Sequence, residues 1–164
     1  MCKLPDKVQP KTKEQLKQLI NYALKHNIYD LNFIGTSKIT DMSWLFENVK
    51  HNFDVSDWDV SNVTDMNNMF YCCNNFNCDL SNWDVSNVTD MASMFAFCNK
   101  FDCDLSNWNV SNVVDMSQMF DCCINFEGKG LENWNLEKIA FCYDMFYGCD
   151  KMTIPSWYKL YYRK

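Results

Sequence analysis

The chain has 164 residues, the size of one domain, and its 4 glycines and 3 prolines are too few for a long flexible linker. The net charge of −6 is unevenly distributed, because residues 1–27 and 151–164 each carry +4 and the residues between them carry −14. An acidic body repels phosphate, which excludes nucleic acid as a partner of the central region. The N-terminal residues hold no apolar core of a signal peptide, and no stretch has the length of a transmembrane helix. Taken at face value, the sequence predicts a cytoplasmic protein without a transmembrane segment.

The first predicted element is a helix over residues 12–27. Its apolar residues follow helical spacing from Leu16 to Leu24, and Thr12 and Gln15 have the form of a capping box. A degenerate repeat follows over residues 39–46. Within a single domain, 1–164, we expect residues 1–35 to cap a repeat region over residues 36–150, because the ends of a repeat array must shield its core.

Tryptophans mark the period of the repeats. Trp58, Trp83, Trp108 and Trp134 are separated by 25, 25 and 26 residues, and a phenylalanine recurs in step with each. Such a period is typical of leucine-rich repeats and related solenoids. Stacked coils bury a continuous column of apolar side chains, so we interpret the Trp, Val, Met and Phe positions as core and expect no cofactor.

Each repeat has two parts with different apolar spacing. Residues 80–88 follow the order L-x-x-L-x-L-x-x-N/C, which predicts a short strand. Residues 91–98 carry apolar side chains at i, i+3, i+4 and i+7, which predicts two turns of helix capped by Thr89 and Asp90. The predicted fold is therefore an α/β, leucine-rich-repeat-like solenoid of about four to five coils, each with a short strand and a short helix.

Residues 151–164 form the predicted C-terminal cap. Aromatic residues follow Pro155 in this segment: Trp157, Tyr158, Tyr161 and Tyr162. We expect them to fold over the open end of the last coil. A tail that lies at a membrane interface is the alternative, because Trp and Tyr are enriched there.

A polar face is predicted along the stack. Alternate side chains of a strand face opposite ways, so the residues beside buried Trp83 and Val85 are exposed. The candidate binding residues are Asp57, Asp59, Asn82, Asp84, Ser86, Asn107, Asn109, Asn133 and Asn135. Solenoids use such faces to bind partners. A solvated surface without a ligand is one alternative, and a calcium ion between Asp59 and Asp84 is another.

The 10 cysteines fall largely into columns at the repeat period. One column contains Cys73, Cys98, Cys123 and Cys149, and a second contains Cys78 and Cys103. A linear ladder does not converge on a tetrahedral metal site, which favours buried free thiols, and we assign no metal ligand. Disulfides between neighbouring coils are an alternative, because a strand spacing of about 4.8 Å lies within the Cα range of a disulfide.

The chain is not expected to be an enzyme, and no catalytic residue is assigned. His26 and His51 accompany no nucleophile, and the sequence lacks a Gly-rich phosphate loop, H-E-x-x-H, G-x-S-x-G and C-x-x-C. We predict instead a module for protein–protein interaction or adhesion. A calcium- or metal-binding structural solenoid is the alternative function.

The block W-[DN]-V-S-N-V-x-D-M-x-x-M-F occurs at residues 58–70, 83–95 and 108–120. This block resembles the repeat of the BspA-like leucine-rich repeat surface proteins, which host-associated bacteria, protists and some large viruses carry. The resemblance spans about residues 40–150, and residues 10–16 resemble the N-terminal cap of that family. It implies a non-enzymatic solenoid that binds proteins. In exported members, which are secreted or lie at the cell surface, the partners are host matrix or cell-surface proteins.

Overall fold

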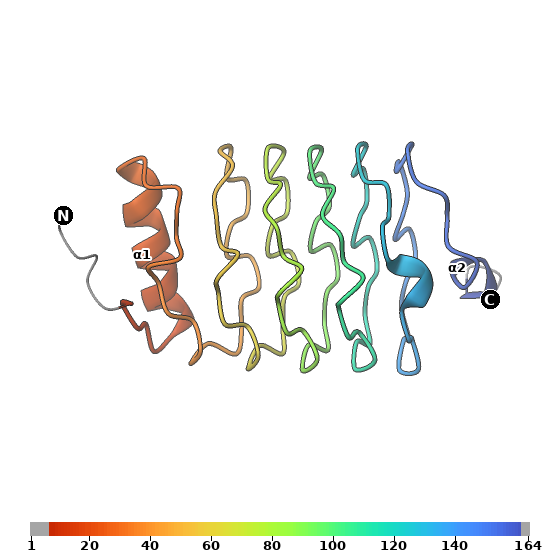
Figure 1. The fold of residues 1–164 in the computed structure, drawn as a ribbon, viewed down its shortest axis with the longest axis horizontal. Helices are drawn as coiled ribbons and strands as arrows, with labels where there is room; N and C mark the ends of the chain where they lie inside the picture. The colour runs from red at the N-terminus through yellow and green to blue at the C-terminus, as the bar shows by residue number, and fades with distance from the viewer. Residues whose placement is uncertain (1–6, 162–164) are drawn as a thin grey trace.

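The computed structural model, described here for residues 7–161, is a stack of irregular coils arranged side by side along the long axis of the molecule (Figure 1). Helix α1, Lys13–Lys25, lies across the N-terminal end, and helix α2, Tyr158–Tyr161, lies at the opposite end. Between them the described chain contains one 3-10 helix, η1, at Leu131–Asn133. Backbone pairing between coils includes isolated parallel bridges, among them Asp65 with Asp90 and Asp90 with Asp115.

The predicted α/β class is therefore wrong. Within residues 7–161 the coils contain neither the predicted helices nor strands that form a sheet. The repeats stack, but each coil is made of successive turns. The short strand plus short helix assigned to every repeat has to be replaced by this irregular backbone.

Residues 91–98 show why the predicted helix does not form. Ser93 and Phe97 have φ values of 54° and 62°, a left-handed conformation that interrupts a right-handed helix. The N–H of Cys98 donates to the Phe95 carbonyl within the coil at 2.9 Å, whereas the N–H of Phe95 donates to Met119 of the next coil at 2.9 Å. Alternate N–H groups thus leave the coil, and a helix needs all of them. The other coils have positive φ at the equivalent positions: Trp44, Asn48, Asn68, Cys72, Gln118, Cys122 and Asp144.

Residues 80–88 are likewise not a strand. The N–H of Trp83 donates to the Leu80 carbonyl at 3.1 Å, and the N–H of Val88 donates to the Val85 carbonyl at 3.0 Å, so two tight turns follow one another. Trp83 and Val85 are nevertheless buried, and Asn82 and Asp84 between them are exposed. The alternation of apolar and polar residues predicted burial correctly and the backbone conformation incorrectly.

The core is a set of side-chain columns, as the period predicts. Phe46, Phe70, Phe95, Phe120 and Phe146 stack with ring centroids 5.4–5.8 Å apart and nearly parallel planes. Each repeat tryptophan is buried and donates its indole N–H to a carbonyl of the preceding coil; Trp83, for example, donates to Val55 at 3.1 Å. The interpretation of the aromatic and Met positions as core is confirmed.

Helix α1 confirms the predicted N-terminal helix, with the bounds Lys13–Lys25. The Thr12 hydroxyl accepts a hydrogen bond from the Gln15 N–H at 3.3 Å, and Gln15 in return accepts from the Lys11 N–H at 2.8 Å. The helix buries Leu16, Ile20 and Ala23 against the first coil.

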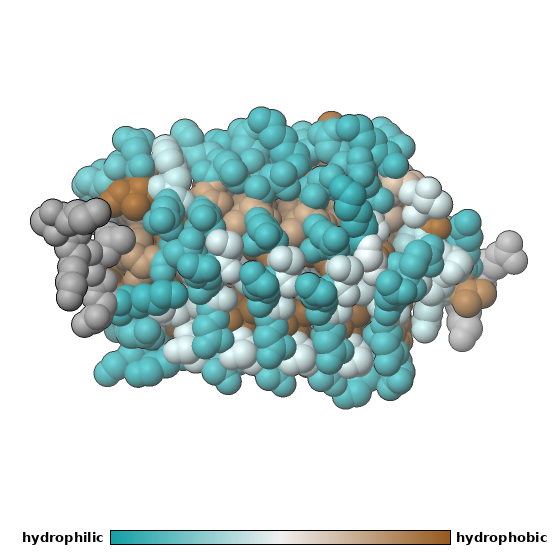
Figure 2. Space-filling view, viewed as in Figure 1, coloured by the Kyte–Doolittle hydropathy of each residue, from teal (hydrophilic) through white to brown (hydrophobic). Residues whose placement is uncertain are grey.

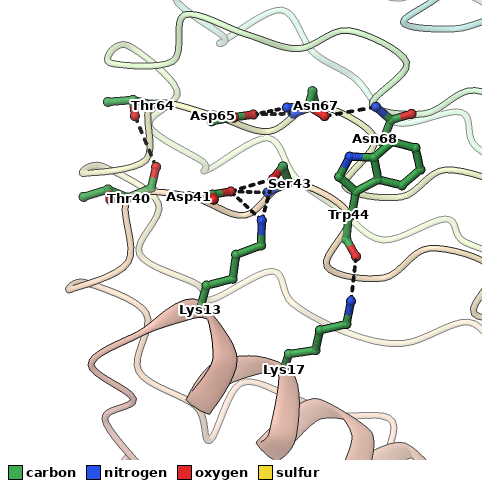
Figure 3. Close-up of polar contacts among 10 residues, drawn as sticks. All are labelled: Lys13, Lys17, Thr40, Asp41, Ser43, Trp44, Thr64, Asp65, Asn67 and Asn68. Atoms are coloured by element: carbon green, nitrogen blue, oxygen red, sulfur yellow. Dashed lines mark hydrogen bonds and ion pairs between the residues drawn. The ribbon is translucent and has the colours of Figure 1, made fainter.

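Lysines of α1 bind the edge of that coil (Figure 3). Lys13 pairs with Asp41 at 2.8 Å and also contacts Ser43, while the Lys17 ammonium donates to the Trp44 carbonyl at 3.5 Å. The basic N-terminal segment thus attaches a cap to the acidic body.

The C-terminal segment covers part of the last coil, as predicted. The Trp157 indole donates to the Leu131 carbonyl at 2.8 Å and so extends the column of tryptophans. The rings of Trp157 and Tyr158 pack on Phe146 with centroids 6.1 and 4.9 Å away. Tyr162 lies outside the described residues. In the part of the chain that the structure describes, no helix is long and apolar enough to cross a membrane.

Candidate interaction face

The predicted binding residues lie on the surface of the stack. Of the nine, Ser86 is partly buried and the others are exposed. They are called here the acidic face: Asp57, Asp59, Asn82, Asp84, Ser86, Asn107, Asn109, Asn133 and Asn135. Hydrophilic residues recur at the coil spacing over the side of the molecule drawn in Figure 2. A regular array of polar groups therefore runs along the stack.

Three residues of this face have a structural role that was not predicted from the sequence. One side-chain oxygen of Asp59, Asp84 and Asn109 accepts the backbone N–H two residues later, at 3.1, 3.1 and 3.2 Å. These are Asx turns, in which a short side chain replaces a backbone acceptor. The signal was present in the sequence as the recurring D-x-S or N-x-S triplet.

Four other residues of the acidic face form no Asx turn. The side chains of Asp57, Asn82, Asn107 and Asn133 make no hydrogen bond within residues 7–161. The side chain of Asn135 donates to Glu137 at 2.9 Å. These unbonded groups are available to a ligand without loss of an internal contact.

An acidic groove beside this face was not predicted. Two adjoining hollows of about 410 and 600 Å³ share Asn77, Cys78 and Asp79 as lining residues. Four of their carboxylates come from equivalent positions of successive coils: Asp30, Asp54, Asp79 and Asp104. A fifth, Asp102, pairs with Lys129 at 3.5 Å. Cys78 and Cys103 lie in the walls, 9% and 6% exposed. Asn107 belongs to both the groove and the acidic face, so the two surfaces are continuous.

The groove carboxylates are held in the ionised form. In Asp54, Asp79 and Asp104 the hydrogen bond from the backbone N–H of the following serine lowers the pKa of the carboxyl. On the acidic face the hydrogen bonds from Ser86 lower the pKa of Asp84 in the same way. Donation to a charged acceptor favours the charged form. The groove therefore keeps its negative charge at neutral pH.

A second column of aspartates contains Asp65, Asp90 and Asp115. Asp90 was predicted to cap a helix, but each of the three instead accepts the N–H two residues later, at 2.9, 2.9 and 2.8 Å, and begins an Asx turn. Burial raises the pKa of Asp90, and the charges of its two neighbours in the column add to the rise. The hydroxyl of Thr89, the other predicted cap, donates to the Thr64 carbonyl at 3.1 Å.

The cysteines of residues 7–161 are all free thiols, and Cys2 lies outside the described residues. The thiols of the first column donate to phenylalanine carbonyls of the preceding coil; Cys98 reaches Phe70 at 3.0 Å. Burial raises the pKa of Cys73 and Cys149 to about 12, and it also raises the pKa of Cys98 well above the ordinary thiol value. These sulfurs stay protonated and act as hydrogen-bond donors in the core.

The calcium and metal alternatives gain no geometric support, and each histidine packs on a tyrosine. Within residues 7–161 no group of three or more His, Cys, Asp or Glu is placed to hold a metal ion. His26 packs on Tyr22 and contacts its carbonyl at 2.8 Å, whereas His51 packs on Tyr29. The two histidines thus have separate surroundings.

The stacked coils and the continuous surface define the chain as a repeat protein with an elongated polar face. A family model matches it twice, over residues 14–129 and 40–157, and the overlap of the two matches follows from the repeated sequence. The chain belongs to this family, which is described as Mycoplasma protein of unknown function, DUF285. No curated protein and no solved structure matches the chain.

Proposed function

We propose that the protein is a non-enzymatic interaction module that binds basic segments of partner proteins along its acidic face and groove. The observation that carries this proposal is the continuous array of carboxylates at the coil spacing, in which the hydrogen bonds of Asx turns lower the pKa of Asp54, Asp79, Asp84 and Asp104. Such an array matches a chain with cationic side chains at regular intervals.

Two features of the array support binding. Within residues 7–161 the ion pairs are Lys13 with Asp41 and Lys129 with Asp102 and Glu127, so the carboxylates of Asp57, Asp59 and Asp84 have no ion-pair partner. The side chains of Asp59 and Asp84 are also preorganised by their Asx turns, and a preorganised surface loses little conformational entropy on binding. The resemblance to BspA-like surface proteins supports adhesion as a narrower form of this proposal.

The test compares charge removal on and off the acidic face. The variant Asp57→Asn, Asp59→Asn, Asp84→Asn removes three charges and keeps the turns, since Asn109 forms the same turn in its own coil. The probe is a peptide of alternating lysine and serine, with alternating glutamate and serine as the control peptide. We expect the lysine peptide to bind the native protein and to bind the variant about tenfold more weakly at an ionic strength of about 0.1 M, where the Debye length is about 10 Å.

A matched control removes three exposed charges elsewhere, by Glu14→Gln, Glu47→Gln and Asp150→Asn. This control is expected to lose little affinity, because charges more than about one Debye length from the ligand are screened. Equal losses in the two variants, or equal binding of the two peptides, would contradict the proposal.

A further inference from the structure

Over residues 91–97 and the equivalent residues of other coils, the backbone hydrogen bonds between coils run in one direction. In the repeat that contains Trp83, the N–H groups of Met91, Ser93, Phe95 and Phe97 donate to carbonyls of the next coil, at distances of 2.7–2.9 Å. The preceding and following repeats continue the pattern at equivalent positions. In this segment each coil therefore accepts through carbonyls on its N-terminal side and donates through N–H groups on its C-terminal side.

The last coil has no coil to donate to. The carbonyls of Phe141 and Tyr143 accept from the coil before, at 2.8 and 2.9 Å. The N–H groups of Cys142 and Asp144, which occupy the donating positions, make no hydrogen bond within residues 7–161. Tyr158 and Trp157 pack around Phe146, whereas Phe141 and Tyr143 are exposed and Cys142 and Asp144 are partly buried.

Apolar side chains surround these unpaired donors. Phe141 and Tyr143 are 53% and 58% exposed, and Leu160 on α2 is 73% exposed. Residues 139–144 and Tyr161 line a groove of about 560 Å³. An edge with unpaired N–H groups and exposed apolar side chains is a site at which another chain can pair.

We propose that this C-terminal edge, residues 141–144, binds an extended segment of a partner protein by continuing the hydrogen bonding between coils. The segment places carbonyls on the N–H groups of Cys142 and Asp144 and an apolar side chain in the groove. Continuity with the interface between coils carries this inference, because every internal coil shows what such an edge accepts: a segment with carbonyls at alternate residues and apolar side chains between them.

The occupant is a different protein rather than a second copy. In a head-to-tail pair, the second copy would have to offer the carbonyl side of its first coil, which α1 covers through Lys13 and Lys17 (Figure 3). In a tail-to-tail pair of this segment, the N–H groups of residues 142 and 144 would face N–H groups of the second copy. The molecule already shows such pairing at its other end, where Val8 adds in parallel beside Ile34 through hydrogen bonds of 2.9 and 2.8 Å.

The probe that tests this edge is a synthetic peptide of residues 88–100 with Cys98→Ser to prevent oxidation. The control peptide carries Met94→Asp and Phe95→Asp in addition. We expect the first peptide to bind and, at saturation, to slow amide exchange at Cys142 and Asp144 at least tenfold. The control peptide should not bind and should not compete with the first peptide. The exchange measurement reports the backbone pairing itself.

Variants of the protein then locate the site. Phe141→Asp is expected to weaken binding at least tenfold and to fold normally, because the equivalent position is aspartate in Asp65, Asp90 and Asp115. Tyr22→Asp, an exposed aromatic on α1, is the matched control and should leave binding unchanged. No binding at millimolar peptide, no protection of residues 142 and 144, or a dimer that protects the same amides would overturn the proposal. The acidic face lies elsewhere, so this test is independent of the proposed function.

Discussion

The inner and outer halves of each coil use hydrogen bonds differently. Inside, Trp83 and Cys98 donate to carbonyls of the preceding coil from fully apolar surroundings. Outside, Asp84 and Asp90 accept N–H groups of their own coil and keep part of their surface in water. Because a lost hydrogen bond costs more where water cannot replace it, the same kind of contact should have different energetic weight in the two halves.

The largest effect is expected at the core tryptophans. Trp83→Ala removes a buried indole and should lower the free energy of unfolding by about 3–5 kcal/mol. Trp83→Phe keeps most of the apolar contact but removes the indole hydrogen bond to the Val55 carbonyl, which retains the Trp58 N–H as a donor, so it should cost about 0.5–1.5 kcal/mol. Chemical denaturation of both variants measures the difference. Equal losses would show that the indole hydrogen bond has no separate weight.

The thiol column should come next. Cys98→Ala removes the donor to the Phe70 carbonyl and should cost about 1–2 kcal/mol. Cys142→Ala is the control, because Cys142 is partly exposed and makes no hydrogen bond within residues 7–161, and it should change stability by less than about 0.5 kcal/mol. Similar losses would mean that the column acts through volume alone.

The Asx turns of the outer half should contribute less. Asp84→Ala removes the acceptor for the Ser86 N–H and should cost about 0.5–1 kcal/mol, as loss of a comparable cap does. Asp84→Asn should be close to neutral, since Asn109 makes the same turn. Thermal unfolding distinguishes the two. A large loss in the Asn variant would show that the charge, rather than the turn, is the stabilising element.

Acid should weaken the outer half selectively. The lowered pKa values of Asp54, Asp79 and Asp104 mean that these groups contribute stability above their ordinary pKa, and that this contribution is lost as pH falls through the lowered values. We expect the melting temperature to fall below about pH 4. A variant with Asn at all three positions should show a shallower fall, and an unchanged pH profile would contradict the assignment.

The smallest effect has the opposite sign. The raised pKa of Asp90 means that its charged form is disfavoured in the fold, so the charge destabilises the protein above that pKa. Asp90→Asn should keep the turn and raise the free energy of unfolding at pH 7 by about 0.5 kcal/mol. The gain should vanish at a pH below the ordinary pKa of aspartate. A loss at pH 7 would mean that Asn forms the turn poorly.

Burial was predictable from the sequence because it depends on the period of the apolar residues. The spacing of Trp58, Trp83 and Trp108 placed the core, and the residues beside Trp83 placed most of the acidic face. Backbone conformation was not predictable from that spacing. Apolar residues at i, i+3 and i+4 occur both in a helix and in the chain of turns at residues 91–98, and only the positive φ of Ser93 and Phe97 distinguishes the two.

The acidic groove and the C-terminal edge were not found in the sequence for a related reason. Asp54, Asp79 and Asp104 form one surface only because successive coils are in register, and their D-x-S triplets look like ordinary loop sequence when read singly. Likewise, the amino-acid sequence of residues 141–144 does not reveal whether their backbone N–H groups form hydrogen bonds with another coil.

The sequence by itself determined that the chain is a stack of repeats, which residues fill its core, and that α1 closes one end. The tertiary structure alone decided the conformation of each coil, the direction of its hydrogen bonds and the surfaces that remain open. The physical reason is that a period records which side chains avoid water, whereas the partner of each N–H group depends on the neighbouring coil.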